Sequence, residues 1–110
     1  MSSIPPAAIS VEELAQRRSG GEALAVLDVR EPWEREICRI PGSLAVPLAA
    51  LPGRLGELPR EGALVVLCHH GARSAQAVEW LRANGFDNAV NLDGGIDAWA
   101  QRVDPAMGTY

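Results

Sequence analysis

Two short apolar runs constrain the fold of this 110-residue chain more than any other feature. Residues 23–27 read Ala-Leu-Ala-Val-Leu and residues 63–67 read Ala-Leu-Val-Val-Leu, with no polar residue in either run. A strand with one solvated face alternates apolar and polar residues, whereas a strand covered on both faces does not. Both runs therefore predict buried strands of a parallel sheet.

Helical patterns separate the strands along the chain. A capping box formed by Ser10 and Glu13 predicts that the first helix starts at Val11. Leucines at positions 51, 55 and 58 lie on one face of a helix expected to start near Pro52. The other expected elements are a short helix from residue 31, helices over residues 74–84 and 96–103, and strands over residues 44–48 and 89–92.

Strands that alternate with helices predict an α/β sandwich built around a parallel sheet. The chain has the length of one compact domain, with an ordinary globular composition of 47% hydrophobic and 22% charged residues. A domain of this size folds without a disulfide or a metal. We therefore expect residues 1–110 to form a single domain, with loose ends over residues 1–8 and 104–110.

The charge pattern argues against several classes of partner. The formal net charge is −4, and the ten basic residues, all arginine, are scattered rather than gathered in a stripe. No apolar stretch approaches the roughly 20 residues of a membrane span, and the start of the chain lacks the pattern of a secretory signal. We expect a cytoplasmic protein with reduced thiols that binds neither nucleic acid nor membrane.

The segment from Cys68 to Ser74, which reads Cys-His-His-Gly-Ala-Arg-Ser, is the strongest candidate for a functional site. It follows a buried strand, and in open α/β sheets the functional crevice lies at the carboxyl ends of the strands. A cysteine there faces the free amides and the positive dipole of the next helix, which stabilise a thiolate. Gly71 lets the loop curl so that its N–H groups point inward, and Arg73 adds positive charge. Cys68 could also be only a small buried residue, but this loop composition serves no packing purpose.

Four motifs in order resemble the rhodanese family over nearly the whole chain. Each motif alone is weak, but their order and spacing together are specific. The motifs are Asp28-Val29-Arg30-Glu31, Ile40-Pro41-Gly42-Ser43, the segment from Cys68 to Ser74, and Asn91-Leu92-Asp93-Gly94-Gly95-Ile96 leading to Trp99. The resemblance implies a rhodanese-like three-layer sandwich, with helices on both faces of a sheet of about five mainly parallel strands.

The resemblance also implies a role for each site residue. Cys68 matches the persulfide-forming cysteine of the family. The residues that match the loop around its sulfur are His69, His70, Gly71, Ala72 and Arg73. The residues expected to support the site are Asp28, Arg30 and Ser74.

The implied activity is that of a sulfurtransferase working by double displacement, with thiosulfate:cyanide transfer as its test-tube reaction. The Cys68 thiolate takes the outer sulfur of thiosulfate or of a persulfide donor, and cyanide, a cellular thiol or a protein acceptor then removes it. This chemistry needs no metal or organic cofactor. The chain is expected to act as a monomer or weak dimer.

The chain departs from the family at Cys38 and Arg39, where members often have Gly-His. Cys38 is either a redox partner of Cys68 or, as we expect, a small buried residue. Arg39 presents a cation at the site entrance or, as we expect, lies in solvent. His69 and His70 are expected at the pocket rim, where their charge varies with pH. We expect no metal there, because three adjacent residues such as these and Cys68 rarely converge on one ion.

Two other function classes stay open. Phosphatases and arsenate reductases also combine a cysteine, a loop of amides and an arginine, with five residues between cysteine and arginine. Here four residues separate Cys68 from Arg73, and the smaller loop fits one sulfur atom better than a tetrahedral oxyanion. The other class is a domain that only docks partners or relays sulfur within a complex, since a fold does not identify an acceptor.

Overall fold

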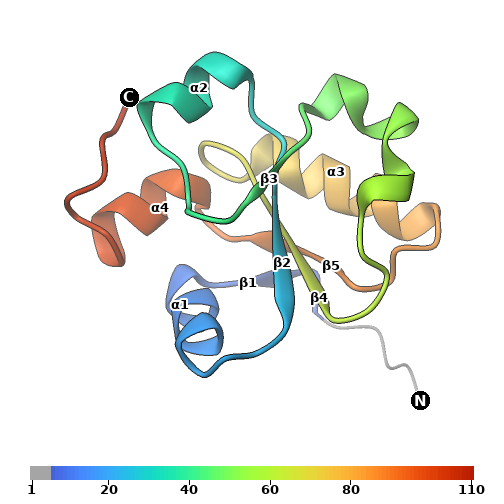
Figure 1. The fold of residues 1–110 in the computed structure, drawn as a ribbon, viewed down its shortest axis with the longest axis horizontal. Helices are drawn as coiled ribbons and strands as arrows, with labels where there is room; N and C mark the ends of the chain where they lie inside the picture. Colours follow the sequence, from blue (N-terminus) through green and yellow to red (C-terminus); the bar gives the residue numbers. More distant parts are fainter. Residues whose placement is uncertain (1–5) are drawn as a thin grey trace.

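The computed structural model describes residues 6–110, which form one open sheet of five strands (Figure 1). The strands are β1 (Ala8–Ile9), β2 (Leu24–Asp28), β3 (Leu44–Ala45), β4 (Ala63–Leu67) and β5 (Ala89–Leu92). Neighbouring strands all run parallel, in the order β1-β5-β4-β2-β3. The expected parallel sheet is confirmed.

The two central strands end at the same level of the sheet. Asp28 at the end of β2 pairs with Leu67 at the end of β4, and the Val29 N–H continues the ladder by donating to the Leu67 carbonyl. The residues that follow these strands, Val29 and Cys68, are therefore neighbours at the carboxyl edge of the sheet.

Helices cover both faces of the sheet, as expected for three layers (Figure 1). The helices are α1 (Val11–Ser19), α2 (Pro32–Ile37), α3 (Ala72–Ala83) and α4 (Gly95–Arg102), with two 3₁₀ helices, η1 (Leu48–Gly53) and η2 (Leu55–Glu57). On one face α1 contacts α4, and on the other α3 contacts η1. Helix α2 lies at the carboxyl edge, above the end of β2.

The core has two parts, one on each face of the sheet. Along β4, Leu64 and Val66 belong to the cluster under α3 and η1, whereas Val65 and Leu67 belong to the cluster under α1 and α4. All four side chains are completely buried. This two-sided burial explains why the strand shows no polar alternation.

The predicted helix near Pro52 is wrong. Residues 48–57 form η1 and η2 instead, because Pro52 lacks an N–H and Gly53 and Gly56 lower helix propensity. Leu51 and Leu58 still face the core, as their spacing indicates. The strand expected over residues 44–48 is also shorter, since β3 ends before Pro47, which cannot donate to a ladder.

The helix caps follow the predicted chemistry with one exception. The Glu13 N–H donates to Ser10 Oγ at 3.0 Å, but the Glu13 carboxylate pairs with Arg17 rather than reaching back. At the end of α3, Gly85 has a φ of 92° and the Phe86 N–H returns to the last turn, which is the expected left-handed cap.

The sequence predicts loose ends over residues 1–8 and 104–110, and the structure describes all but the first five of these residues. Residues 1–5 lie outside the described part, whereas Ala8 and Ile9 form an edge strand that the sequence pattern did not indicate. In residues 104–110, Met107 and Tyr110 pack against the core cluster under α1 and α4, because both carry apolar surface that this face can bury. No helix in residues 6–110 is long and apolar enough to cross a membrane.

Candidate active site

Cys68 follows the last residue of β4 and is 1% exposed. The next three residues turn the chain into α3, which starts at Ala72. The turn depends on Gly71, whose φ of 113° is rarely adopted by residues with a side chain. This conformation aims the Gly71 N–H at Cys68 Sγ, 3.0 Å away. The loop thus curls around the sulfur, as the glycine predicts.

The loop favours the thiolate form of Cys68. Burial alone would raise the pKa of the thiol, but hydrogen bonds from the Ser74 hydroxyl and from loop amides outweigh burial and lower the pKa below its ordinary value. The amides are those of Ser74, Gly71 and Arg73. The start of α3 therefore provides a ring of donors around one sulfur atom, and a thiolate is the reactive form of cysteine.

Ser74 connects the sulfur to β5. Its hydroxyl lies 3.3 Å from Cys68 Sγ and 2.5 Å from Asn91 Oδ1, and its single proton can serve only one acceptor at a time. Asn91 Nδ2 also donates to the Gly71 carbonyl at 3.2 Å. Because a charged sulfur is the stronger acceptor, the hydroxyl can turn to Cys68 when the thiolate forms. Asn91 thus binds both Gly71 and Ser74 of the loop, a role that the family motif containing Asn91 did not specify.

The amino end of α4 fixes the carbonyls of the loop. The Ile96 N–H donates to the Cys68 carbonyl at 2.9 Å, and the Asp97 N–H donates to the His69 carbonyl at 3.0 Å. Gly95 has a φ of 61°, and a Cβ there would stand 2.5 Å from both of these carbonyl oxygens. Only glycine allows the helix to approach the loop so closely.

Arg73 points to α2 rather than to the sulfur. Its Nη1 and Nη2 donate to Glu34 Oε1 and Oε2 at 2.7 and 2.8 Å, which is a two-pronged ion pair. The Glu34 side chain is 4% exposed, and the Arg73 guanidinium holds its pKa at about 2. Glu34 raises the pKa of Arg73 in turn, so both groups stay charged. No sequence pattern marked Glu34 as buried.

Asp28 and Arg30 form a completely buried ion pair beside the loop. Arg30 Nη2 donates to Asp28 Oδ2 at 2.8 Å and to the Cys38 carbonyl at 2.7 Å. Burial alone would lower the pKa of Arg30, but the hydrogen bonds that Arg30 donates to Asp28 and Tyr110 outweigh it and raise the pKa. The pair does not touch Cys68. It ties the end of β2 to the turn after α2.

The two histidines lie at the rim of the site. The His69 ring stacks on the rings of His70 and Tyr110, at centroid distances of 3.9 and 4.0 Å. Burial, together with the neighbouring His70, lowers the pKa of His69. His70 is exposed and lies 3.8 Å from Asp97. These two histidines and Asp97 bring three ligand atoms within 4.8 Å of one another, so this group, without Cys68, could hold an ion.

The two residues that depart from the family pattern lie away from the sulfur. Cys38 is 8% exposed and belongs to the core cluster under α1 and α4, whereas Cys68 belongs to the cluster under α3. Both thiols are free. Arg39 is exposed and lines a cavity of about 460 Å³ together with Arg35 and Arg54.

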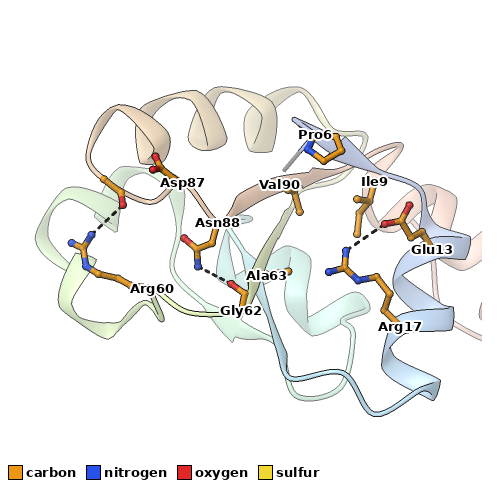
Figure 2. Close-up of a pocket in the computed structure, with 11 residues that line it drawn as sticks. Pro6, Ile9, Glu13, Arg17, Arg60, Gly62, Ala63, Asp87, Asn88 and Val90 are labelled. Carbon is orange, nitrogen blue, oxygen red and sulfur yellow. Dashed lines mark hydrogen bonds and ion pairs between the residues drawn. The ribbon is translucent and has the colours of Figure 1, made fainter. Parts of the chain in front are cut away.

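Another cavity of about 460 Å³ lies at the opposite end of β4 (Figure 2). Its lining includes Ala63 at the start of the strand and contains none of the predicted site residues. Arg17 in its wall pairs with Glu13, and Arg60 donates to the Gly85 carbonyl (Figure 2). Because this lining contains neither a cysteine nor a histidine, the candidate active site remains the Cys68 edge.

Comparison with known proteins identifies the family to which this chain is similar. A model of the rhodanese-like domain matches residues 10–102. A sulfurtransferase of Allochromatium vinosum is 39% identical over 90% of this chain and 92% of that protein. The probable adenylyltransferase/sulfurtransferase MoeZ of Mycobacterium tuberculosis is 38% identical over 93% of this chain, which spans only 26% of MoeZ.

Solved structures give the same result. A rhodanese-related protein from Thermoplasma volcanium superposes with a TM-score of 0.81 and 36% identity, over 89% of this chain and 94% of that one. The human single-domain sulfurtransferase TSTD1 superposes with a TM-score of 0.79 and 27% identity, over 89% of this chain and 98% of that one. The chain therefore belongs to the family of rhodanese-like domains.

Proposed function

We propose that this protein transfers sulfane sulfur through a persulfide on Cys68. The observation that carries the proposal is the lowered pKa of a buried thiol that accepts hydrogen bonds from the loop amides and from Ser74. A purely structural cysteine needs no such donors. The sulfurtransferases among the related proteins support the same chemistry.

The proposed reaction has two displacement steps. The Cys68 thiolate attacks the outer sulfur of thiosulfate, a sulfur–sulfur bond forms to Cys68, the original sulfur–sulfur bond breaks, and sulfite leaves with the electron pair. Cyanide or a thiolate then attacks the outer sulfur of the persulfide, and the Cys68 thiolate departs. No oxidant or reductant is consumed, and no metal or organic cofactor takes part.

Each loop residue has a proposed task. The amides of Gly71, Arg73 and Ser74, which bind the Cys68 sulfur, also hold the terminal sulfur of the persulfide. Arg73 supplies a positive charge near the anionic donor, and its pairing with Glu34 keeps it in place. His69 and His70 form the rim, and Ala72 is the first residue of α3. Asp28, Arg30 and Ser74 support this arrangement.

The physiological donor is thiosulfate or a persulfide, and the acceptor is a thiol or a protein. A protein acceptor draws support from MoeZ and from the putative sulfur carrier protein YrkF of Bacillus subtilis, which is 35% identical over 94% of this chain. Two free cysteines fit a reducing compartment such as the cytoplasm. We propose that the chain acts as a monomer or weak dimer.

The test is sulfur loading measured by intact mass. Wild-type protein incubated with thiosulfate should gain one sulfur atom, which cyanide removes as thiocyanate. Cys68→Ser should gain none, while the matched variant Cys38→Ser keeps most of the loading. Loss of loading in a folded Cys38→Ser protein would overturn the assignment.

Loop size provides the test against phosphatase chemistry. Wild type should transfer sulfur and leave an aryl phosphate intact. Inserting one residue between Gly71 and Ala72 should widen the ring of amides and weaken sulfur transfer. If the wild type cleaves the phosphate ester through Cys68 and transfers no sulfur, the phosphatase assignment replaces this one.

A further inference from the structure

Tyr110 joins two ion pairs beside the loop, one completely buried and one half-buried. Its hydroxyl donates to Glu34 Oε2 and accepts a hydrogen bond from Arg30 Nη1 at 3.1 Å. Glu34 is paired with Arg73, and Arg30 is paired with Asp28. One phenol thus links the end of β2 to the start of α3. The Asp28–Arg30 pair reaches the loop through Tyr110, since neither residue contacts Cys68.

The Tyr110 ring also makes contacts of its own, with two other rings and one guanidinium. It stacks on the His69 ring at 4.0 Å with an interplanar angle of 18°, and it meets the Trp33 ring edge-on at 5.6 Å. The Arg30 guanidinium lies 5.8 Å from the ring centroid. These contacts come from α2, from the end of β2 and from the loop after Cys68. Packing alone needs the ring, whereas the two hydrogen bonds need the hydroxyl.

From this geometry we propose that Tyr110 is a positioning residue of the sulfur-transfer site, an inference that rests on the proposed function. Its hydroxyl donates a hydrogen bond to the Glu34 carboxylate and so offsets part of the negative charge that faces Arg73. More of the Arg73 charge then stays available to the Cys68 thiolate and to an anionic donor. The direction of the effect follows from charge: without the hydroxyl, Glu34 neutralises Arg73 more fully.

The phenol is suited to stay a donor in this position. Burial, partly offset by Arg30 and reinforced by Glu34, raises the pKa of Tyr110 to about 12. The hydroxyl therefore keeps its proton wherever Cys68 reacts. The pKa of Glu34 is about 2, so its carboxylate is charged at neutral pH. The hydrogen bond therefore joins a neutral donor to a charged acceptor.

The matched variant is Tyr110→Phe, which keeps the ring and removes only the hydroxyl. No buried group loses its last partner, because Arg30 Nη1 retains the Glu34 carbonyl at 3.3 Å and Glu34 Oε2 retains Arg73. The protein should fold with an unchanged circular dichroism spectrum. Trp80→Phe, on the exposed side of α3, is the aromatic control.

The readout is the pH dependence of Cys68 alkylation by iodoacetamide, measured in a Cys38→Ser background so that one thiol reports. We expect Tyr110→Phe to raise the apparent pKa of Cys68 by about half a unit, equivalent to roughly 0.7 kcal/mol. The kcat/KM for thiosulfate should fall about three- to tenfold. Alkylation does not depend on sulfur transfer, so the inference can be judged even if the proposed function fails.

A double-mutant cycle separates this role from simple packing. If Tyr110 acts through Glu34 and Arg73, Tyr110→Phe should produce no further pKa shift in an Arg73→Ala background. An equal shift in both backgrounds, or no shift in either, overturns the inference. A shift of the same size in Trp80→Phe overturns it as well, because that residue touches none of the four charged groups.

Discussion

Arg73 and Glu34 form a two-pronged ion pair between α3 and α2, across 39 positions of sequence. Its carboxylate is almost completely buried, while its guanidinium is 37% exposed. The pair fixes the start of α3, where the amides around Cys68 begin. We expect the Glu34 charge to affect mainly stability and the Arg73 charge to affect mainly activity.

Glu34→Gln should flatten the loss of stability in acid. The folded pKa of Glu34, about 2, lies below its ordinary value of 4.5, so ionised Glu34 stabilises the fold above about pH 4.5, and this contribution is lost as the pH falls toward 2. Urea unfolding at pH 7, 4 and 2.5 measures the free energy of unfolding of both proteins. The excess of the wild-type value over that of Glu34→Gln should shrink as the pH falls from 4.5 toward 2. An advantage that does not vary with pH would mean that the pair contributes nothing through its charge.

Arg73→Ala should lower kcat/KM for thiosulfate by at least about tenfold, because a cation near the donor is lost. Arg73→Lys should restore only part, since an ammonium cannot reproduce the fork that Glu34 binds. The alanine variant also removes the cation that pairs with a buried carboxylate, which keeps only the hydrogen bonds from Tyr110 and the Glu31 N–H, at a cost of at most about 3 kcal/mol. The double variant Arg73→Ala/Glu34→Gln should recover stability and stay slow; full activity there would show that the loop amides suffice.

Ser74→Ala should raise the pKa of Cys68. The hydroxyl is the strongest of the hydrogen-bonding groups that lower this pKa, and a bond to a charged acceptor is worth about 1.5–3 kcal/mol. We expect a rise of about one unit, measured from the pH dependence of alkylation. Ser43→Ala, which changes a hydroxyl bound to the Ile40 carbonyl, is the control and should leave the titration in place. An unchanged titration in Ser74→Ala would assign the shift to the amides alone.

Gly95→Ala should damage both fold and site. The new Cβ meets two backbone oxygens at 2.5 Å in a left-handed conformation, so either α4 or the loop has to move. We expect a loss of at least about 2 kcal/mol in urea unfolding and of most sulfur loading. Gly56→Ala, with no atom within 4 Å of its Cβ, should be close to neutral. Equal behaviour of the two variants would refute the close approach of α4.

The sequence predicted what depends on local pattern. The unbroken apolar runs identified β2 and β4, and the position of Cys68 after the second run placed it at the carboxyl edge. Gly71 predicted the inward curl of the loop. Leucine spacing alone wrongly predicts a helix near Pro52, because it does not reflect the lower helix propensity of Gly53 and Gly56.

The supporting network depends on contacts that no local pattern carries. In the sequence, Glu34 is an ordinary glutamate in the first turn of a short helix. Its role follows only from the ion pair with Arg73 of α3. Tyr110 lies in a segment whose composition indicates a loose end, and its partners are 76 and 80 positions away. Asn91 is a polar residue within a short buried strand, and only the fold shows that it faces the loop.

The contact between Gly95 and the loop carbonyls also constrains the order in which the site can form. Cys68 enters the sheet with β4, but the N–H groups that hold its carbonyl and that of His69 belong to residues 96 and 97. A chain that has folded only through β4 has the nucleophile without its complete support. Thiolate reactivity at Cys68 would then develop late in folding, after β5 and α4 have docked. The rate of Cys68 alkylation, measured at successive times during refolding, would therefore report when β5 and α4 have docked.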